Sequence, residues 1–404
     1  MMRIKKRNFI FVLVTAMLIG VFSSGAGFFI WSKATDQMII SSREYKAYTK
    51  VKEDYGKLSA LQAMIEQYYY TDVDEDKLYE GIYKGLFAGL DDPYSYYMNA
   101  SEYENLQIST TGEFSGVGVT LAADSEGYIC VVAPIEDTPA AKAGIRPGDR
   151  ITKVDGVSYS GAQLDEAVQK MRGPAGQTVT LTVLRDGKEK EYTMKRANIV
   201  MQTVKSELLD GDIAYIRITS FEKNTAEDFR KALRDFEVAG VKGLIVDLRD
   251  NPGGLVDSAV AVADELLPAG TVAYTQNRQG DKEYYKTKGA GTNLPYVLLI
   301  NGGSASASEI LAGAVQDNKG GTLVGTTSYG KGIIQSITPL EDGSGAAVKM
   351  TILQYFSPNG NVIHKKGITP DYVVELPEGK IVNEDLDRKD DSQLQKAVEI
   401  LKKK

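Results

Sequence analysis

Hydrophobic and polar residues follow four successive patterns along the chain, and each pattern predicts a different kind of structure. Residues 9–31 are uncharged and mostly apolar, and a helix of this length can cross a hydrocarbon core of about 30 Å. Residues 36–105 carry apolar side chains at helical spacing, which predicts amphipathic helices. Residues 112–198 form short β-rich runs separated by glycines, which is typical of a small β-rich domain. After residue 199, predicted strands and helices alternate, which indicates an α/β core.

The expected elements of this core can be placed from their apolar runs. We expect strands at 213–218, 243–248, 272–274, 296–300 and 322–324, and a hairpin formed by 333–337 and 346–353. Helices are expected at 225–238, 255–267 and 308–316. A charged tail from about residue 376 precedes a capped amphipathic helix at 391–401, which we expect to be free to pair with another chain.

Composition narrows the classes of function. Apolar residues make up 43% and charged residues 25% of the 404 residues, which excludes a disordered, collagen-like or wholly membrane-embedded protein. The net charge of −7 offers no global positive field, so nucleic acid is not an expected partner. One cysteine, Cys130, and one histidine, His364, leave too few soft ligands for a structural zinc site. We expect neither a metal nor a cofactor.

The N-terminus carries targeting information. Arg3, Lys5, Lys6 and Arg7 precede the apolar run, and a basic flank of this kind stays in the cytoplasm. The run is longer than a usual signal-peptide core, which favours a signal anchor, while the small residues at 23–27 keep cleavage as an alternative. The prediction is a single-pass protein of the cell membrane whose remaining chain is extracytoplasmic.

Two glycine-bearing loops of the α/β core are candidates for chemistry. Residues 247–254 (DLRDNPGG) and 301–309 (NGGSASASE) each follow an apolar strand and precede a helix. Such loops lie at the carboxyl edge of the sheet, where N–H groups at a helix N-terminus favour negative charge. This geometry suits an oxyanion, and it also suits a phosphate. The second loop offers Ser304, Ser306 and Ser308 as possible nucleophiles, and the spacing alone does not choose among them.

A lysine between two glycines is the candidate base. Lys331 lies in the segment 326–335 (TTSYGKGIIQ) just before a predicted strand, and the chain has no histidine placed to serve a serine. Lysine can accept a proton only if burial lowers its pKa from about 10.4 toward neutrality. Gln335 lies four residues further on, and residues at i and i+4 of a strand share a face, so its amide could orient the lysine.

The β-rich segment resembles a PDZ domain, the module that captures a peptide C-terminus. The resemblance rests on the string PAAKAGIRPGDRI at 139–151 and covers residues 112–198. It implies that a terminal carboxylate binds the backbone N–H groups of one loop while the peptide pairs with the next strand. The expected peptide-binding residues are Phe114, Ser115, Gly116, Val117, Gly118 and Arg172.

Residues from about 60 to 375, continuing into the C-terminal helix, resemble the PDZ-containing C-terminal processing peptidases of serine-protease family S41. The matching strings outside the PDZ segment are DPYS at 92–95, DLRDNPGG at 247–254, GSASASE at 303–309 and YGKG at 329–332. The resemblance implies a crotonase-like or ClpP-like α/β core, Ser306 as the nucleophile, Lys331 as the general base and Gln335 as its partner. It also implies an oxyanion hole formed by the N–H of Ala307 and that of either Gly253 or Gly254.

Competing assignments of the site have weaker support. Ser220 and Lys223 fit the S-x-x-K pattern of penicillin-binding enzymes, but they follow a strand and lack a Ser-Asp-Asn partner. His364 lies beside two lysines in a turn-like stretch, which predicts a solvated surface histidine. A non-catalytic PDZ scaffold and a crotonase-type acyl-CoA enzyme are the alternative functions.

The preferred interpretation is a membrane-anchored extracytoplasmic endopeptidase that is gated by its PDZ domain. Its expected partners are proteins or peptides with a free C-terminus, and a second copy of the chain paired through the N- and C-terminal helices. The expected regions are a basic flank at 1–7, a transmembrane anchor at 8–31, a helical region at 32–108, the PDZ domain at 109–198, the protease core at 199–375 and a tail with a helix at 376–404.

Overall fold

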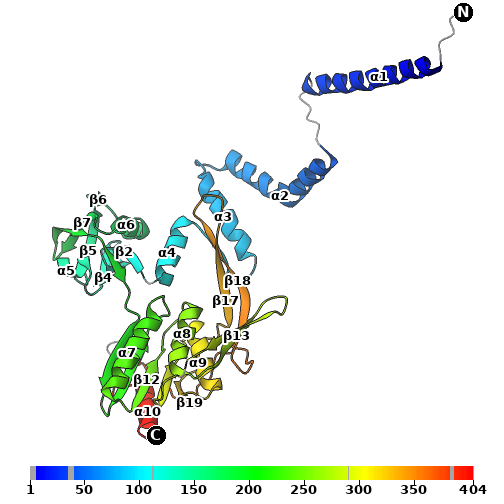
Figure 1. Ribbon diagram of the computed structural model, residues 1–404. Helices are drawn as coiled ribbons and strands as arrows, with labels where there is room; N and C mark the ends of the chain where they lie inside the picture. Colours follow the sequence, from blue (N-terminus) through cyan, green and yellow to red (C-terminus); the bar gives the residue numbers. More distant parts are fainter. Residues whose placement is uncertain (1–5, 35–40, 112, 290, 383–385, 404) are drawn as a thin grey trace, which may run out of the picture. The chain divides into compact units, whose positions relative to one another are not determined.

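Two compact units make up the chain, residues 1–81 and residues 82–404. The computed structural model describes residues 6–34, 41–111, 113–289, 291–382 and 386–403 (Figure 1). Helix α1 (Lys6–Ala34) contains the stretch Ile10–Phe28, which is long and apolar enough to cross a membrane. Arg3 and Lys5 of the basic flank lie outside the described residues.

Helix α2 (Ser42–Tyr68) begins at a capping box. Ser41 Oγ accepts the Glu44 N–H at 3.2 Å, and the Glu44 carboxylate accepts the Ser41 N–H at 2.7 Å. The expected apolar stripe of this helix is present but uncovered, because none of the residues of α2 is buried. Its members Leu58, Leu61, Met64 and Ile65 are between 36% and 57% exposed. Helix α3 follows at Glu75–Ala88.

The second unit is built around a six-stranded sheet in the order β10–β11–β12–β15–β16–β19. Only β10 pairs antiparallel with its neighbour, and the remaining pairs are parallel. The strands are β10 (Val204–Leu209), β11 (Ile213–Ile218), β12 (Gly243–Asp247), β15 (Tyr296–Ile300), β16 (Thr322–Gly325) and β19 (Tyr372–Val373). Every residue of β12 and β15 is buried, as expected for strands covered on both faces.

Helices cover both faces of this sheet. Leu244 and Val246 pack into a core with α7 (Thr225–Ala239), α8 (Val256–Leu266) and α9 (Ala307–Asp317), whereas Ile245 faces the opposite side. This alternation follows from the two-residue period of a strand. A second sheet, in the order β1–β18–β13–β14 with β17 beside β18, contacts the helix layer through α8 and α9.

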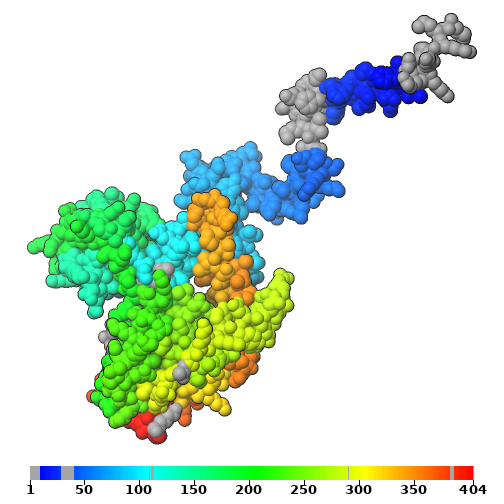
Figure 2. Space-filling model, viewed as in Figure 1, coloured from blue at the N-terminus to red at the C-terminus, as the bar shows by residue number. Residues whose placement is uncertain are grey.

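The second sheet contains a long hairpin that Figure 2 shows standing out from the core. The hairpin consists of β17 (Ile333–Pro339) and β18 (Ala347–Phe356). The other strands of this sheet are β1 (Tyr96–Met98), β13 (Gly270–Gln276) and β14 (Lys282–Thr287). The sequence patterns did not predict β14 or β10, because both expose most of their residues and lack an apolar run.

The C-terminal helix α10 (Ser392–Leu401) corrects one expectation. Its predicted cap is present, since Asp391 accepts the Leu394 N–H at 2.9 Å. Its apolar face is not free, however, because Leu394, Ala397 and Leu401 pack on β12, β15 and β16 of the same chain. The prediction that this helix is available to pair with another chain is therefore wrong.

A separate six-stranded sheet forms within residues 119–195, in the order β3–β4–β5–β7–β8 with β6 beside β5. Its strands are β3 (Val119–Ala123), β4 (Ile129–Pro134), β5 (Arg150–Val154), β6 (Val157–Ser158), β7 (Thr178–Arg185) and β8 (Lys188–Lys195). Helices α5 (Pro139–Ala143) and α6 (Leu164–Met171) and a short 3₁₀ turn (Gly161–Gln163) accompany this sheet. Helix α4 (Ala100–Thr111) precedes it, and β2 (Glu113–Gly116) pairs with β9 (Ala197–Val200) beside it.

Candidate active site

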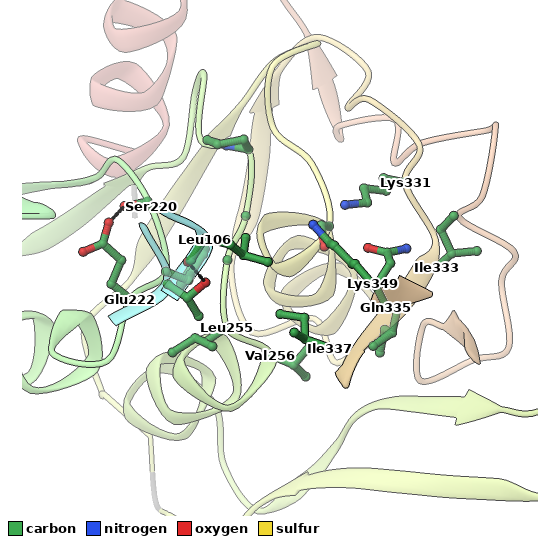
Figure 3. A pocket seen from close by; sticks show the side chains of 17 residues that line it. Leu106, Ser220, Glu222, Leu255, Val256, Lys331, Ile333, Gln335, Ile337 and Lys349 are labelled. Carbon is green, nitrogen blue, oxygen red and sulfur yellow. Dashed lines mark hydrogen bonds between the residues drawn. The ribbon is translucent and has the colours of Figure 1, made fainter. Parts of the chain in front are cut away.

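All but Ala307 of the residues expected to carry the chemistry line one pocket of about 390 Å³. Gly253 and Gly254 come from the loop after β12, Ser306 from the start of α9, and Lys331 and Gln335 from the start of the hairpin. Figure 3 shows Lys331, Gln335 and Lys349 at one end of this pocket and Ser220 and Glu222 at the other. Apolar side chains line the space between the two ends: Leu106, Leu255, Val256 and Ile337.

Ser306 has an unusual backbone conformation. Its φ of 55° and ψ of −113° are rare for a residue with a side chain and cost about 1–3 kcal/mol. Surrounding hydrogen bonds hold this geometry. The Ser306 N–H donates to Glu309 Oε2 at 2.9 Å, and the Ser306 carbonyl accepts the Tyr355 hydroxyl at 3.0 Å. The strained turn aims the N-terminus of α9 at the pocket, as in a nucleophile elbow.

The two neighbouring serines have structural partners instead. Ser304 Oγ donates to the Leu248 carbonyl at 2.8 Å, and its residue is 1% exposed. Ser308 Oγ donates to the Asn251 carbonyl at 2.9 Å, and its residue is fully buried. Both hydroxyls tie the serine loop to the glycine loop, which leaves Ser306 as the serine of this loop that lines the pocket.

The two glycines differ in their hydrogen bonds. Gly253 N–H donates to Asn251 Oδ1 at 2.9 Å, so a side chain already occupies this donor. Among the described residues, Gly254 N–H and Ala307 N–H have no such partner. A Cβ at Gly253 would lie 2.9 Å from the Ala307 nitrogen and 2.9 Å from Ser306 Cβ, and φ is +102°. The missing side chain therefore keeps open the space in front of the Ala307 N–H.

Lys331 lies in a partly desolvated position. Burial lowers the pKa of its amine, and the positive charge of Lys349 lowers that pKa further. The carboxylates of Asp92 and Glu309 act in the opposite direction. Within the described part of the chain, no hydrogen bond or ion pair involves Lys331 Nζ, which lies 4.7 Å from the centroid of the Tyr94 ring.

Gln335 lines the same pocket, but it does not share a strand with Lys331 as expected. Lys331 precedes β17 rather than belonging to it, and the register shifts between Ile334 and Gln335. The two side chains therefore do not meet as i and i+4 of a regular strand. Gln335 Nε2 donates to Thr351 Oγ1 at 3.2 Å, and no hydrogen bond joins it to Lys331 among the residues that the structure describes.

Glu309 joins the serine loop to the lysine loop, a role that the sequence reasoning missed. Its Oε2 accepts the N–H groups of Ser306 at 2.9 Å and Lys331 at 2.8 Å. Its Oε1 accepts the Ser328 hydroxyl and the Gly330 N–H, both at 2.6 Å. Glu309 is fully buried. The Ser-x-x-Glu spacing of a capping box is the sequence pattern that could have identified Glu309.

A buried ionic cluster supports the glycine loop from behind. Arg249 donates to the carboxylates of Asp247 and Asp391, with its closest contacts at 2.6 Å and 2.8 Å. All three residues are at most 4% exposed. The two carboxylates raise the pKa of the Arg249 guanidinium despite its burial. Because Asp391 also caps α10, the cluster connects the C-terminal helix to the loop that carries Gly253 and Gly254.

Glu222 is a buried carboxylate at the far end of the pocket. It is 7% exposed, and Ser220 Oγ donates to its Oε1 at 2.9 Å. Its Oε2 is buried and has no hydrogen-bond partner among the described residues. Burial raises the pKa of this carboxyl, and the Ser220 hydrogen bond opposes the shift only in part.

His364 is less exposed than the sequence suggested. The side chain is half-buried, its Nδ1 is buried without a partner among the described residues, and its backbone lies against Gly332. The prediction of a solvated surface histidine is therefore wrong. The lysine loop packs on the turn that contains His364, since the Lys365 N–H donates to the Gly330 carbonyl at 2.7 Å.

The residues expected to bind a peptide gather around a groove beside β3. A small pocket of about 70 Å³ is lined by Phe114, Gly116, Val117, Gly118, Val119, Leu121, Val168, Met171 and Arg172. Strand β3 is the edge strand of its sheet, so its outer side can accept another strand. Gly118 has a φ of +78°, and a Cβ there would lie 2.3 Å from Thr138 Cβ. Ser115 is outside this lining, and its Oγ is buried without a partner among the described residues.

Arg172 connects this groove to helix α4. Its guanidinium carbon lies 5.9 Å from the centroid of the Phe114 ring, and its Nη1 donates to Asn105 of α4. Burial lowers the pKa of the guanidinium. The Arg172 side chain is therefore packed against Phe114 and helix α4.

Three family descriptions match this chain. Residues 212–374 match "Peptidase family S41", residues 131–185 match "PDZ domain", and residues 17–102 match "Activating protease CtpB N-terminal domain". A carboxy-terminal-processing protease of Bartonella bacilliformis is 41% identical over 350 residues, which cover 84% of this chain and 79% of that protein. The carboxy-terminal processing protease CtpA of Bacillus subtilis is 38% identical over 327 residues, which cover 80% and 70%.

A solved structure shares the fold. A putative S41 protease from Bacteroides fragilis aligns with a TM-score of 0.51 and 18% identity, covering 84% of this chain and 96% of that one. The fold and the pocket define an α/β hydrolytic core joined to a PDZ domain. The chain belongs to peptidase family S41, among the PDZ-containing carboxy-terminal processing serine proteases.

Proposed function

We propose that this protein is a serine endopeptidase in which Ser306 is the nucleophile and Lys331 the general base. The observation that carries the proposal is the environment of Ser306. This serine has a strained backbone, faces the pocket that contains Lys331, and lies between two serines whose hydroxyls are engaged elsewhere. Strained backbone concentrates at functional sites because the surrounding structure must hold it in place.

The proposed reaction follows from the chemistry of the two groups. Neutral Lys331 accepts the proton of Ser306 Oγ as Oγ bonds to the substrate carbonyl carbon. The resulting ammonium returns that proton to the leaving amine when the peptide bond breaks. The burial that lowers the pKa of Lys331 increases the neutral fraction at a given pH. Gln335 lines the same pocket as Lys331 and is the candidate for orienting that lysine, with its own amide held by the Thr351 hydroxyl.

The oxyanion hole is assigned to the N–H groups of Ala307 and Gly254. Gly253 was an equal candidate, but its N–H donates to Asn251. Gly253 contributes in another way, because its missing side chain leaves room beside the Ala307 nitrogen. Donors at a helix N-terminus that are already in place stabilise the charge of a tetrahedral intermediate without reorganisation.

The PDZ domain is proposed to gate this site by binding a substrate C-terminus along β3. Residues 114–118 would bind the carboxylate. Arg172 is the candidate for transmitting peptide binding to the catalytic pocket, because it contacts both Phe114 and α4. Helix α4 also contributes Leu106 and Thr110 to the catalytic pocket. Gating requires that the peptide bind the active state of the enzyme more tightly than the resting state.

Membrane anchoring and pairing belong to the same proposal. The stretch Ile10–Phe28 would span the membrane once and leave the catalytic unit outside the cytoplasm. The uncovered stripe of α2 supports a homodimer formed through the N-terminal helices, whereas the face of α10 is already occupied. The stripe consists of apolar residues at helical spacing, which is the pattern of a pairing helix.

The test is casein hydrolysis by the full-length chain in detergent. We expect Ser306→Ala and Lys331→Ala each to abolish turnover with the fold retained, because nucleophile and base act as a unit. Ser304→Ala is the matched control and should keep much more activity, with any loss explained by the broken contact to Leu248. Turnover that survives in Ser306→Ala but not in Ser304→Ala would overturn the assignment.

A further inference from the structure

Hydrogen bonds hold the loop at residues 92–95 beside the catalytic pocket. Asp92 accepts the Tyr94 N–H at 3.0 Å and the Ser95 hydroxyl at 2.6 Å. Ser95 is 5% exposed and accepts the Thr351 N–H of β18 at 2.9 Å. Thr351 is also the residue that binds the Gln335 amide. The loop therefore holds Tyr94 at a fixed place against the strand that supports the lysine end of the pocket.

Tyr94 provides the contact that the structure gives to the Lys331 ammonium. Lys331 Nζ lies 4.7 Å from the centroid of the Tyr94 ring, within the range of a cation–π interaction. The Tyr94 hydroxyl bonds the Tyr329 hydroxyl at 3.3 Å, and Tyr329 belongs to the lysine loop. Within the described residues no carboxylate lies close enough to form an ion pair with Lys331, whose ammonium instead lies over the face of the Tyr94 ring.

A ring face distinguishes the two protonation states of a lysine. The π electrons attract an ammonium ion and have no comparable attraction for a neutral amine. The other charged groups facing Lys331 are Lys349 on β18, which disfavours the ammonium, and Asp92 and Glu309, which favour it. Tyr94 thus acts on the same equilibrium as these charges, but through contact rather than through net charge.

We propose that Tyr94 is a positioning residue for the catalytic base: its ring holds the Lys331 ammonium in the resting enzyme and releases the neutral amine to Ser306. The inference rests on the proposed function, in which Lys331 must be neutral to accept the serine proton. Lys331 contacts the Tyr94 ring and also lines the pocket that contains Ser306. The hydrogen bonds of Asp92 and Ser95 hold the loop, and with it the ring, in place when the amine leaves.

The experiment is the pH dependence of kcat/KM for the full-length chain with four residues at position 94. The alkaline-rising limb reports the pKa of the base in the free enzyme. Tyr94→Phe keeps the ring and should leave the limb unmoved. Tyr94→Leu keeps an apolar cover but removes the π face, and should shift the limb down by about half to one and a half pH units. Tyr94→Trp offers a stronger π face and should shift the limb upward.

We expect the midpoint of the pH limb to be lowest for Leu, higher and equal for Phe and Tyr, and highest for Trp. A purely structural role would lower activity without ordering the midpoints in this way. Unchanged midpoints, or an upward shift in Tyr94→Leu, would overturn the inference. The ring would then serve only to exclude water. Should one variant fold poorly by circular dichroism, the remaining pair still gives a signed shift relative to wild type.

The same measurements separate this inference from the function on which it rests. Lys331→Ala is included in the series. If Lys331→Ala retains activity, the proposed function fails together with the inference. If Lys331→Ala is inactive while the position-94 variants share one midpoint, the proposed function stands and only the role of Tyr94 is lost.

Discussion

Replacing Glu309 with glutamine tests whether one buried carboxylate holds the serine and lysine loops together. Oε2 accepts the N–H groups of Ser306 and Lys331, with the Tyr355 hydroxyl further away at 3.5 Å, and Oε1 accepts the Ser328 hydroxyl and the Gly330 N–H. A glutamine keeps one acceptor oxygen and turns the other into an NH₂ group that faces two donors. Each hydrogen bond to a charged group contributes about 1.5–3 kcal/mol, so the loss is about 3–6 kcal/mol.

Glu222→Gln is the matched control for this substitution. Both residues are buried glutamates of the unit formed by residues 82–404, here called the catalytic unit. The Glu222 carboxylate, however, accepts only the Ser220 hydroxyl among the described residues and has one oxygen without a partner there. Thermal unfolding of the full-length variants in detergent should show Tm lowered by about 6–24 °C in Glu309→Gln. Glu222→Gln should not lower it. Hydrogen exchange should also quicken at the Gly330 and Lys331 amides in Glu309→Gln alone. A Glu309→Gln protein with wild-type Tm and casein turnover would refute the reasoning.

Two of three further predictions concern buried charges, and the third concerns the membrane orientation. Asp391→Ala should destabilise the core by about 3–5 kcal/mol, because it leaves the buried Arg249 half-paired, whereas Asp390→Ala, at an exposed pair with Lys380, should cost little by thermal unfolding. Glu222→Gln should be more stable than wild type at neutral pH. Because burial raises the folded-state pKa of Glu222, wild-type stability falls as pH rises from the unfolded pKa through the folded one, so the difference between the proteins should vanish at low pH. Protease added to intact spheroplasts should digest the catalytic unit, and full protection would contradict the proposed orientation of α1.

The centre of the α/β core was predictable from sequence because its central strands are buried on both faces. Runs such as Tyr296–Ile300 and Ile213–Ile218 are apolar at nearly every position, and their observed bounds agree with the expected ones. Helices α7, α8 and α9 differ from expectation by one residue at one or both ends. The polar strand β14 gave no such signal, because its residues mostly face solvent.

The sequence predicted which residues would share the pocket, but not the hydrogen bonds that connect them. The motifs placed Ser306, Lys331 and Gln335 in one pocket, as the structure does. Which glycine N–H is free depends on a hydrogen bond from Gly253 to Asn251, and no spacing rule reports that bond. The clusters around Glu309 and Arg249 join residues far apart in the chain, so only the tertiary structure reveals them.

The central claim is that Lys331 activates Ser306, and covalent labelling tests it most directly. A fluorophosphonate bonds to an activated serine, and tandem mass spectrometry identifies the labelled residue. The account predicts labelling at Ser306, at a rate that rises with pH through the lowered pKa of Lys331, with no labelling in Lys331→Ala and an unchanged pH profile in His364→Ala. Labelling at Ser304 or Ser308, or a Ser306 rate that does not change in Lys331→Ala, would contradict it.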